Sequence, residues 1–373
     1  MHPEFSNPVD GSAALVAPLD RRQAIIAPLS RPPRRVLFFG KSMSRTKATA
    51  GLVEALLGAG LDVRWVNVAK QRQWLGRTLA LRRVTRIFER FAPDLVFVFC
   101  RDLPRPLLER IAPRVPVVMW IEEPIERVDE GYAEYMRQVH AVFMTNPARI
   151  PWLFDHGIRH VGFTLEGFSP TWHRPLTADR PLKRNLAFIG GPGRDGLRAH
   201  FLAAIAQRHP LEIFGKGWES WRRHYPVLDV RGPVGPRQYQ EICATTRIVL
   251  GINQINDDPL YFSNRTLFTL ACRGFHLTHY VPKLETLFGD GEHLAWFHDV
   301  DDCLARIDQY LHLDDERDRI ARRGCDLVHR EHQFRHRIAN ILGVLAPHKT
   351  RGELLAHDLA ARLRGSGAAK QAE

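Results

Sequence analysis

The sequence predicts an α/β protein of two domains, each containing a parallel sheet of the Rossmann type, and three observations support this. Short runs of β-branched and aromatic residues recur along the chain without the polar–apolar alternation of half-exposed strands. Helical patterns separate most of these runs, which is typical of parallel sheets covered on both faces. The chain of 373 residues is also long for a single core, so two domains are expected.

The predicted strands form two series, and the second restarts after a polar stretch containing several prolines. That stretch, FSPTWHRPLTADRPLKR at 168–184, has the composition of a linker. The first series comprises 36–40, 63–68, 95–100, 115–121, 141–145 and 161–164, and the second comprises 186–190, 212–214, 229–231, 248–252, 275–278 and 294–297.

These strands divide the chain into four parts. Residues 1–33 contain several prolines and are expected to form a flexible N-terminal arm. Residues 34–168 form the N-terminal Rossmann-like domain, 169–345 the C-terminal one, and 346–373 a flexible or helical tail. Open parallel sheets bind ligands outside the carboxyl ends of their strands, so we expect the two domains to face each other across a cleft.

Composition limits the location and the partners. No run approaches the ~20 apolar residues of a membrane span, and the N-terminus lacks a secretory signal, which predicts a cytoplasmic protein. Five scattered cysteines are expected to be core thiols. The net charge of +12 suits a phosphate-bearing ligand or peripheral contact with the inner face of a membrane. No nucleic-acid motif is present, so nucleic acid is not an expected partner.

The first predicted strand leads into Gly40-Lys41-Ser42, which is similar to the end of an ATP-binding P-loop. That loop needs another glycine five positions before Gly40, and Arg35 stands there instead. We therefore interpret these three residues as a loop on the first-domain side of the cleft and not as a phosphate cradle.

Two glycine-containing loops follow strands of the second series. In NLAFIGGPGRDGLR, Gly190 and Gly191 precede a helix, where the backbone can approach a diphosphate and either Arg194 or Arg198 can add a formal charge. In LEIFGKGW, Lys216 follows the next strand, and its ammonium group suits a phosphate. A glycine-rich turn without a ligand and a solvated lysine are the alternative interpretations.

The segment DPLYFSNRTLFTLACRGFHLTHYVPKLETLFGDGEHLAWF, residues 258–297, is the most informative. It resembles the CgeB-like glycosyltransferases, the spore maturation protein CgeB family. Their pattern is an Arg, a helix ending in Ala-Cys-Gly, a strand ending in Leu-Thr, then Pro-x-Leu-Glu-x-Leu-Phe and Gly-x-Glu. The resemblance covers most of 34–345, weakly before about Asn185 and strongly after it, and HQFRHR at 332–337 also matches.

The resemblance implies a GT-B fold and transfer of a sugar from a nucleotide-sugar donor to an unidentified glycan, lipid or protein acceptor. Cationic groups of the second domain would neutralise the leaving diphosphate, so neither a metal nor another cofactor is expected. The expected donor-binding residues are Gly190, Gly191, Arg194, Lys216, Asn264, Arg265 and Glu285.

The chain departs from the family pattern at the helix of this segment. Relatives have a Glu that holds the donor ribose where this chain has Phe268, and a phenyl ring cannot accept a hydrogen bond from a ribose hydroxyl. Arg273 also stands before Gly274, where relatives have Gly directly after Ala-Cys. A non-catalytic sugar- or nucleotide-binding protein of the same fold is therefore the alternative function.

The fourth predicted strand ends in Glu122-Glu123-Pro124, and the proline keeps the preceding residue extended. At the carboxyl edge of the first sheet, Glu122 or Glu123 could take a proton from the acceptor hydroxyl. Two exposed surface carboxylates are the competing interpretation. Whether the sugar bond is inverted or retained does not follow from these residues.

Two patterns similar to metal sites have simpler explanations. The DVD stretch at 299–301 copies an Asp-x-Asp metal signature, but it begins a predicted helix, so an N-terminal cap explains it better. His329, His332 and His336 share one helical face, yet no fourth ligand is evident. We therefore expect no metal site.

Overall fold

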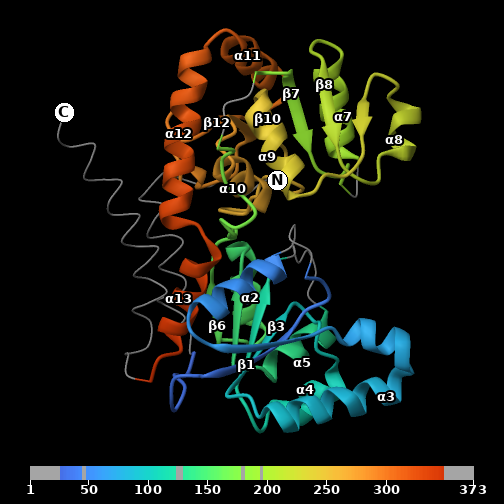
Figure 1. The fold of residues 1–373 in the computed structure, drawn as a ribbon, viewed down its shortest axis with the longest axis vertical. Coiled ribbons are helices and arrows are strands. Elements are labelled where there is room, and N and C mark those ends of the chain that lie inside the picture. The colour runs from blue at the N-terminus through green and yellow to red at the C-terminus, as the bar shows by residue number, and fades with distance from the viewer. Residues whose placement is uncertain (1–25, 44–47, 123–128, 178–180, 194–195, 348–373) are drawn as a thin grey trace, which may run out of the picture. The chain divides into compact units, whose positions relative to one another are not determined.

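The computed structural model describes residues 26–43, 48–122, 129–177, 181–193 and 196–347 (Figure 1). Contacts between residues divide the chain into two compact units. The first comprises the described residues among 1–41, 60–164 and 339–373, and the second those among 42–59 and 165–338.

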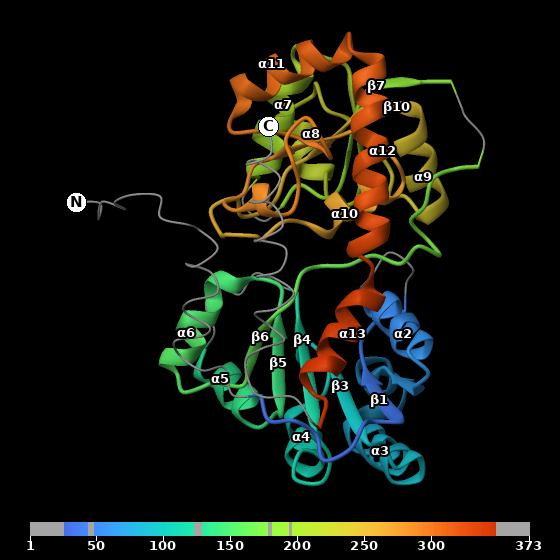
Figure 2. The same ribbon diagram turned by 90° about the vertical axis from the view of Figure 1, so that its left-hand side faces the viewer.

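The first unit contains a six-stranded sheet in the order β2-β1-β3-β4-β5-β6, in which all neighbouring strands are parallel. Figure 2 shows β1, β3, β4, β5 and β6 side by side. The central strands are buried on both faces, as their continuous apolar runs predict. The strands are β1 (Arg35–Phe39), β2 (Asp62–Val66), β3 (Leu95–Phe99), β4 (Val117–Ile121), β5 (Ala141–Met144) and β6 (Val161–Phe163).

The second unit contains another six-stranded parallel sheet, in the order β12-β11-β10-β7-β8-β9. Its chain runs outward from β7 through β8 to β9, then returns to place β10 on the other side of β7. The strand order therefore reverses between β7 and β10, where such sheets bind ligands. The strands are β7 (Arg184–Ile189), β8 (Leu211–Phe214), β9 (Asp229–Arg231), β10 (Thr246–Gly251), β11 (His276–His279) and β12 (Ala295–Phe297).

The helices alternate with these strands, as the sequence predicts. None of those in the described ranges is long and apolar enough to cross a membrane. They are α2 (Ala48–Gly58), α3 (Val68–Phe91), α4 (Arg105–Ile111), α5 (Glu130–Arg137), α6 (Ile150–Asp155), α7 (Leu197–Ala206), α8 (Glu219–His224), α9 (Pro236–Thr245), α10 (Asn264–Ala271), α11 (Val300–Leu311), α12 (Asp314–Glu331) and α13 (Phe334–Val344).

All the predicted strands are present, with ends that differ by no more than two residues. The N-terminal segment differs from the prediction, because residues 26–33 are held against the first unit. Ile26 and Leu29 are buried, and the Leu29 amide donates to the Leu345 carbonyl at 2.9 Å. Arg31 forms an ion pair with Asp94. Residues 1–25 and the tail from 348 lie outside the described residues.

Helix α2 groups with the second unit, although the sequence assigns it to the N-terminal domain. The Glu54 carboxylate accepts hydrogen bonds from the hydroxyls of Ser169 and Thr171, in the segment that follows β6. Gly51 faces the Phe334 ring so closely that an added Cβ would lie 2.3 Å from its Cδ2. These contacts are long-range in sequence, so the strand–helix pattern could not predict them.

The HQFRHR stretch, residues 332–337, also joins α2 to the segment that follows β6. The Phe334 ring is 3% exposed and also lies close to Gly167, since a Cβ added at Gly167 would be 2.7 Å from the ring. The buried Arg337 guanidinium donates to the carbonyls of Glu166, at 3.0 Å, and Glu331. The stretch therefore fixes the chain after β6 to the beginning of α13.

Candidate functional site

The loop after β7 and the loop after β8 interlock through their backbones. The Gly190 amide donates to the Phe214 carbonyl at 2.8 Å, and the Gly190 carbonyl accepts from the Trp218 indole at 2.9 Å. A Cβ added at Gly215 would lie 2.1 Å from the Gly190 oxygen. Only glycine fits there, so the GKGW motif and the Gly190 loop form one rigid edge of the sheet beside the switch point.

Helix α10 directs Arg265 at this edge. The Ser263 side chain caps the helix by accepting from the Arg265 amide. The Arg265 guanidinium lies against the Gly190 backbone, since a Cβ added at Gly190 would be 2.4 Å from Nη1. It also lies 5.7 Å from the centre of the Phe188 ring. The missing side chain of Gly190 thus makes room for a cation.

A second arginine reaches the same edge from the first turn of α7. Arg198 is 8% exposed, and it donates through Nε to the Ile252 carbonyl at 2.9 Å and through Nη1 to the Gly191 carbonyl at 3.3 Å. Burial, and then repulsion from Arg265, lower the pKa of Arg198 to about 9. Burial likewise lowers the pKa of Arg265. Arg265 therefore destabilises the charged form of Arg198, in addition to the effect of burial.

No carboxylate in the described part of the chain forms an ion pair with Arg198 or Arg265. Buried charges are normally paired, because removing a charge from water costs several kcal/mol unless an opposite charge compensates. Two adjacent cations at a ligand-binding edge of the sheet therefore form a site that an anion would complete.

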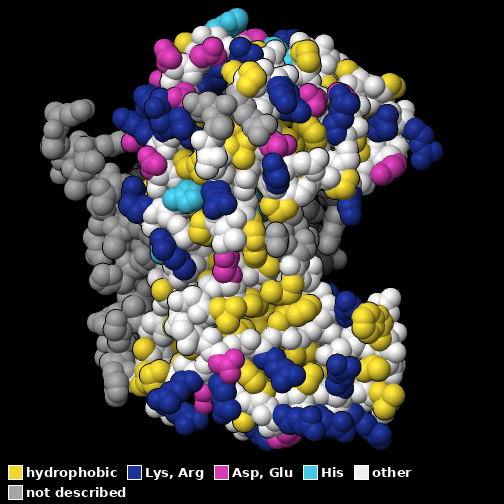
Figure 3. Space-filling view, viewed as in Figure 1, with side chains coloured by type: hydrophobic (Ala, Val, Ile, Leu, Met, Phe, Trp, Pro, Cys, Tyr) yellow, Lys and Arg dark blue, Asp and Glu magenta, His cyan; other side chains and the backbone are white. Residues whose placement is uncertain are grey.

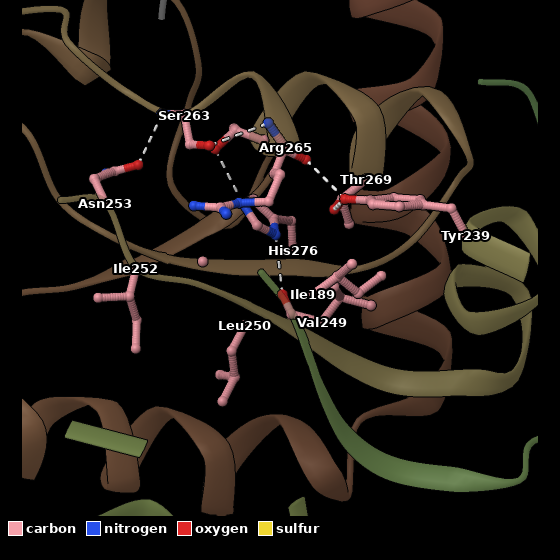
Figure 4. A pocket seen from close by; sticks show the side chains of 12 residues that line it. Ile189, Tyr239, Val249, Leu250, Ile252, Asn253, Ser263, Arg265, Thr269 and His276 are labelled. Carbon is pink, nitrogen blue, oxygen red and sulfur yellow. Dashed lines mark hydrogen bonds between the residues drawn. The ribbon is translucent and has the colours of Figure 1, made fainter. Parts of the chain in front are cut away.

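A small pocket opens beside Arg265 (Figure 4). Asn253, which follows β10, lines it together with Ser263, Arg265 and His276. Asn253 is 2% exposed, and its Oδ1 accepts from the Ser263 amide at 2.8 Å. Its Nδ2 is buried without a hydrogen-bond partner among the described residues. This donor is available to a ligand, and its position directly after a central strand was a signal that our sequence interpretation missed.

The other expected donor residues are more dispersed. Lys216 is exposed in the loop after β8, and Asn264 is the first residue of α10, but neither lines the pocket. Glu285 lies in a 3₁₀ turn after β11, where it accepts from the Tyr280 hydroxyl at 2.9 Å, and it does not line the pocket either. Arg194 lies outside the described residues.

Phe268 points into the second unit and does not line the pocket. Its ring stacks on the imidazole of the buried His173, with centroids 3.9 Å apart and planes 9° from parallel. Tyr239 packs edge-on against both rings, and its hydroxyl forms a hydrogen bond with Thr269. Phe268 therefore has a packing role between α10 and the segment after β6.

We expect Phe268→Glu to lower the thermal midpoint of the protein strongly, because it buries a carboxylate against an imidazole that is itself neutral. An uncompensated buried charge costs on the order of 3–5 kcal/mol. Phe268→Leu is the matched control and should cost less. A midpoint unchanged in Phe268→Glu, with stronger nucleotide binding, would show that the position faces the donor.

The buried histidines make stability depend on pH. Burial lowers the pKa of His173 to about 4, and it does the same for His276. The folded state therefore binds fewer protons than the unfolded state between about pH 6.5 and 4, so the free energy of unfolding should fall on acidification through that window. Each histidine contributes on the order of 3 kcal/mol by pH 4.

His173→Phe keeps the stacking partner of Phe268 and removes the titrating group. Its midpoint should fall less than that of the natural chain between pH 7 and 4.5, which differential scanning fluorimetry would measure. His224→Phe, at an exposed position of α8, is the control. Equal acid sensitivity of all three proteins would contradict this role of His173.

The helix α10 ends at a strained residue. Arg273 takes a φ of 59°, a left-handed conformation that favours glycine, at the position where the CgeB-like pattern has glycine. The Arg273 guanidinium pairs with Asp318 of α12 at 2.9 Å. The departure from the pattern therefore adds an ion pair between the end of α10 and α12.

In the first unit, Gly40 and Lys41 follow β1 and are held by neighbouring strands. The Gly40 carbonyl accepts from the Trp65 indole at 2.8 Å. The Asp102 carboxylate, which is nearly buried, accepts from the Lys41 amide at 2.7 Å and forms an ion pair with its ammonium at 2.9 Å. The Lys41 charge is therefore compensated by Asp102, and the role of Gly40, Lys41 and Ser42 as a cleft loop stays a prediction.

Glu122 directly follows β4 and is half-buried, at the carboxyl end of the strand where the sequence places it. Glu123 lies outside the described residues. A role for either as the base stays a prediction.

The residues suspected of metal binding have structural partners. Asp299 caps α11 by accepting from the Asp302 amide at 2.8 Å, which confirms the capping interpretation. The His329 ring bonds the Ala271 carbonyl at 3.0 Å, whereas the His332 ring contacts Arg337. No group of three His, Cys, Asp or Glu within the described ranges could hold a metal ion.

Comparisons with known proteins agree with this architecture. Residues 194–343 match the family model "Glycosyl transferase-like". No curated protein matches the sequence significantly. HepE from Anabaena, solved with UDP and glucose, superposes with a TM-score of 0.59 at 13% identity over 83% of this chain and 99% of that one.

Two further solved structures are similar at equally low identity. Sucrose-phosphate synthase from Thermosynechococcus elongatus gives a TM-score of 0.61 at 10% identity, over 90% of this chain and 100% of that one. A glycosyltransferase from Rickettsia africae gives 0.62 at 9% identity, over 84% and 98%. At such identities the likeness establishes the fold. The chain thus has the GT-B fold and carries a glycosyltransferase domain in residues 194–343.

Proposed function

We propose that the protein transfers a sugar from a nucleoside-diphosphate sugar whose diphosphate binds at Arg198 and Arg265. The observation that carries this proposal is the pair of adjacent guanidinium groups at the Gly190-Gly191 edge, without a carboxylate partner among the described residues. Guanidinium groups match phosphate oxygens in geometry and charge. The unpartnered Asn253 amide supplies a further donor.

Uridine diphosphate is the first nucleotide to test, because HepE was solved with UDP and with UDP-glucose. In our proposal Lys216, on the loop that interlocks with Gly190, contributes a mobile positive charge to the leaving diphosphate. Arginine and lysine then replace a divalent cation, so transfer is metal-independent. We also propose a narrower family assignment, in which the protein is a CgeB-like glycosyltransferase.

On the acceptor side we propose that Glu122 or Glu123 takes the proton from the acceptor hydroxyl. A half-buried carboxylate at a strand end is suited to general-base catalysis when its surroundings raise its pKa. Glu122→Gln and Glu123→Gln test this separately. The expected result is loss of turnover in one of them, with UDP binding unchanged in both.

Thermal unfolding with UDP, GDP, ADP or CMP tests the donor site, since a ligand bound by the folded state raises the midpoint by mass action. We expect one diphosphate to raise it and CMP to raise it less. EDTA should leave the shift unchanged if no metal takes part. Release of UDP from UDP-sugars without an acceptor then measures turnover.

The non-catalytic alternative predicts a different outcome. A nucleotide-induced shift without release of nucleotide from any sugar nucleotide, with or without cell-derived glycan or lipid acceptors, would favour a binding protein. No shift with any nucleotide would overturn the assignment of the arginine pair to a diphosphate.

A further inference from the structure

Helix α3 of the first unit carries an unusual concentration of uncompensated positive charge. Its segment after the non-helical Gly76 contains five exposed arginines. They are Arg77, Arg82, Arg83, Arg86 and Arg90. The acidic residue of the helix, Glu89, is already paired with Arg114, which follows α4, by two contacts of 2.5 and 2.9 Å. None of the five arginines forms an ion pair with another described residue.

Two large apolar side chains of the same element are also exposed. Trp74 is 73% exposed, the highest value among the large hydrophobic residues described, and Leu79 is 55% exposed. Leu79 precedes Arg82, Arg83, Arg86 and Arg90 by three, four, seven and eleven residues, so it shares their face of the helix. The opposite face, with Ala80, Val84 and Phe88, packs into the core.

The segment before Gly76 continues the same pattern. The Lys70 ammonium lies 4.8 Å from the centre of the Trp74 ring, and Arg72 in the same segment is also exposed. Figure 3 shows Lys and Arg side chains gathered along the lower edge, where Figure 1 draws α3, with hydrophobic side chains nearby. We call this combined feature, from Lys70 to Arg90, the α3 surface.

We propose that the α3 surface binds an anionic lipid bilayer, with Trp74 and Leu79 entering the headgroup region and the arginines contacting lipid phosphates. Two features favour a bilayer. A basic helix face with apolar residues among the charges is typical of helices that lie in the membrane interface. Tryptophan also prefers the boundary between hydrocarbon and water. A nucleic acid would use the arginines but would leave Leu79 in water.

This proposal is independent of the donor site, because α3 and the arginine pair lie in different units. The contact that we propose is peripheral. No described helix is long and apolar enough to cross a membrane. Acceptors dissolved in the bilayer would then be concentrated near the protein.

Sedimentation of the full chain with vesicles tests the proposal. We expect at least ~10-fold stronger binding to phosphatidylcholine vesicles containing phosphatidylglycerol than to phosphatidylcholine alone, weakening as salt is raised. Arg82→Gln with Arg86→Gln should reduce this preference, and Trp74→Ser with Leu79→Ser should reduce binding at all salt concentrations.

Matched controls test whether vesicle binding depends on the α3 surface itself or only on the net charge and exposed apolar area of the protein. Arg222→Gln with Arg223→Gln changes the net charge equally on exposed α8, and Leu182→Ser removes an apolar side chain that is 45% exposed. Both should bind vesicles normally, and every variant should keep its UDP-induced thermal shift. Equal losses in control and α3 variants, no preference for anionic lipid, or stronger binding to duplex DNA at the same salt would overturn the proposal.

Discussion

Replacing Arg265 with leucine is expected to abolish most nucleoside-diphosphate binding while leaving the ligand-free protein as stable as before, or more stable. Loss of hydrogen bonds from a charged group costs about 1.5–3 kcal/mol, which corresponds to roughly 10–100-fold weaker binding. The ligand-free protein should not suffer, because the substitution removes the repulsion that lowers the pKa of Arg198. Opposite effects on stability and binding distinguish a ligand site from a structural cation.

The measurements are thermal unfolding without ligand and titration calorimetry with UDP. Arg247→Leu is the matched control, since Arg247 is a partly exposed arginine of the same unit that contacts Asp314 and Asn185. It should lose a little stability and keep the affinity. An Arg265→Leu protein that is destabilised and still binds UDP normally would show that Arg265 supports the fold.

The second large effect is expected from Phe334→Ala, which should lower the free energy of unfolding of the second unit by about 3–5 kcal/mol. Its buried ring fills the space that the missing side chains of Gly51 and Gly167 leave, so truncation opens a cavity between α2 and the chain after β6.

Chemical denaturation monitored by tryptophan fluorescence would measure this loss, and Phe334→Leu, which keeps much of the volume, should lose less. Leu313→Ala, at a position 40% exposed, is the control for a surface truncation. A Phe334→Ala protein as stable as this control would mean that the Gly51 and Gly167 backbones close over the gap.

Strand and helix positions followed directly from the sequence because each depends on neighbouring residues. The fully buried β4 has a continuous apolar run, and the Ser263 cap and the Asp299 cap use side chains within three residues of the groups they satisfy. Grouping of α2 with the second unit could not be predicted, since it depends on Ser169 and Phe334, more than 100 residues away.

The candidate site also combines features that depend on neighbouring residues with features that depend on residues far apart in the sequence. Glycines after β7 and β8 were identified from their positions after strands, and Arg265 from the resemblance to the CgeB-like pattern. The sequence could not choose between Arg194 and Arg198, could not show that Arg198 and Arg265 lie close enough to repel each other, and did not reveal Asn253. It also left the direction of Phe268 open, which proved to face His173.

The sequence by itself thus determined the two parallel sheets and the edge at which a ligand would bind, because hydrophobic periodicity and turn chemistry are local properties of the chain. Only the tertiary structure decided which charges meet without a counter-ion and which aromatic rings are packing groups. Electrostatic and packing energies depend on distances between segments, and a linear pattern does not contain those distances.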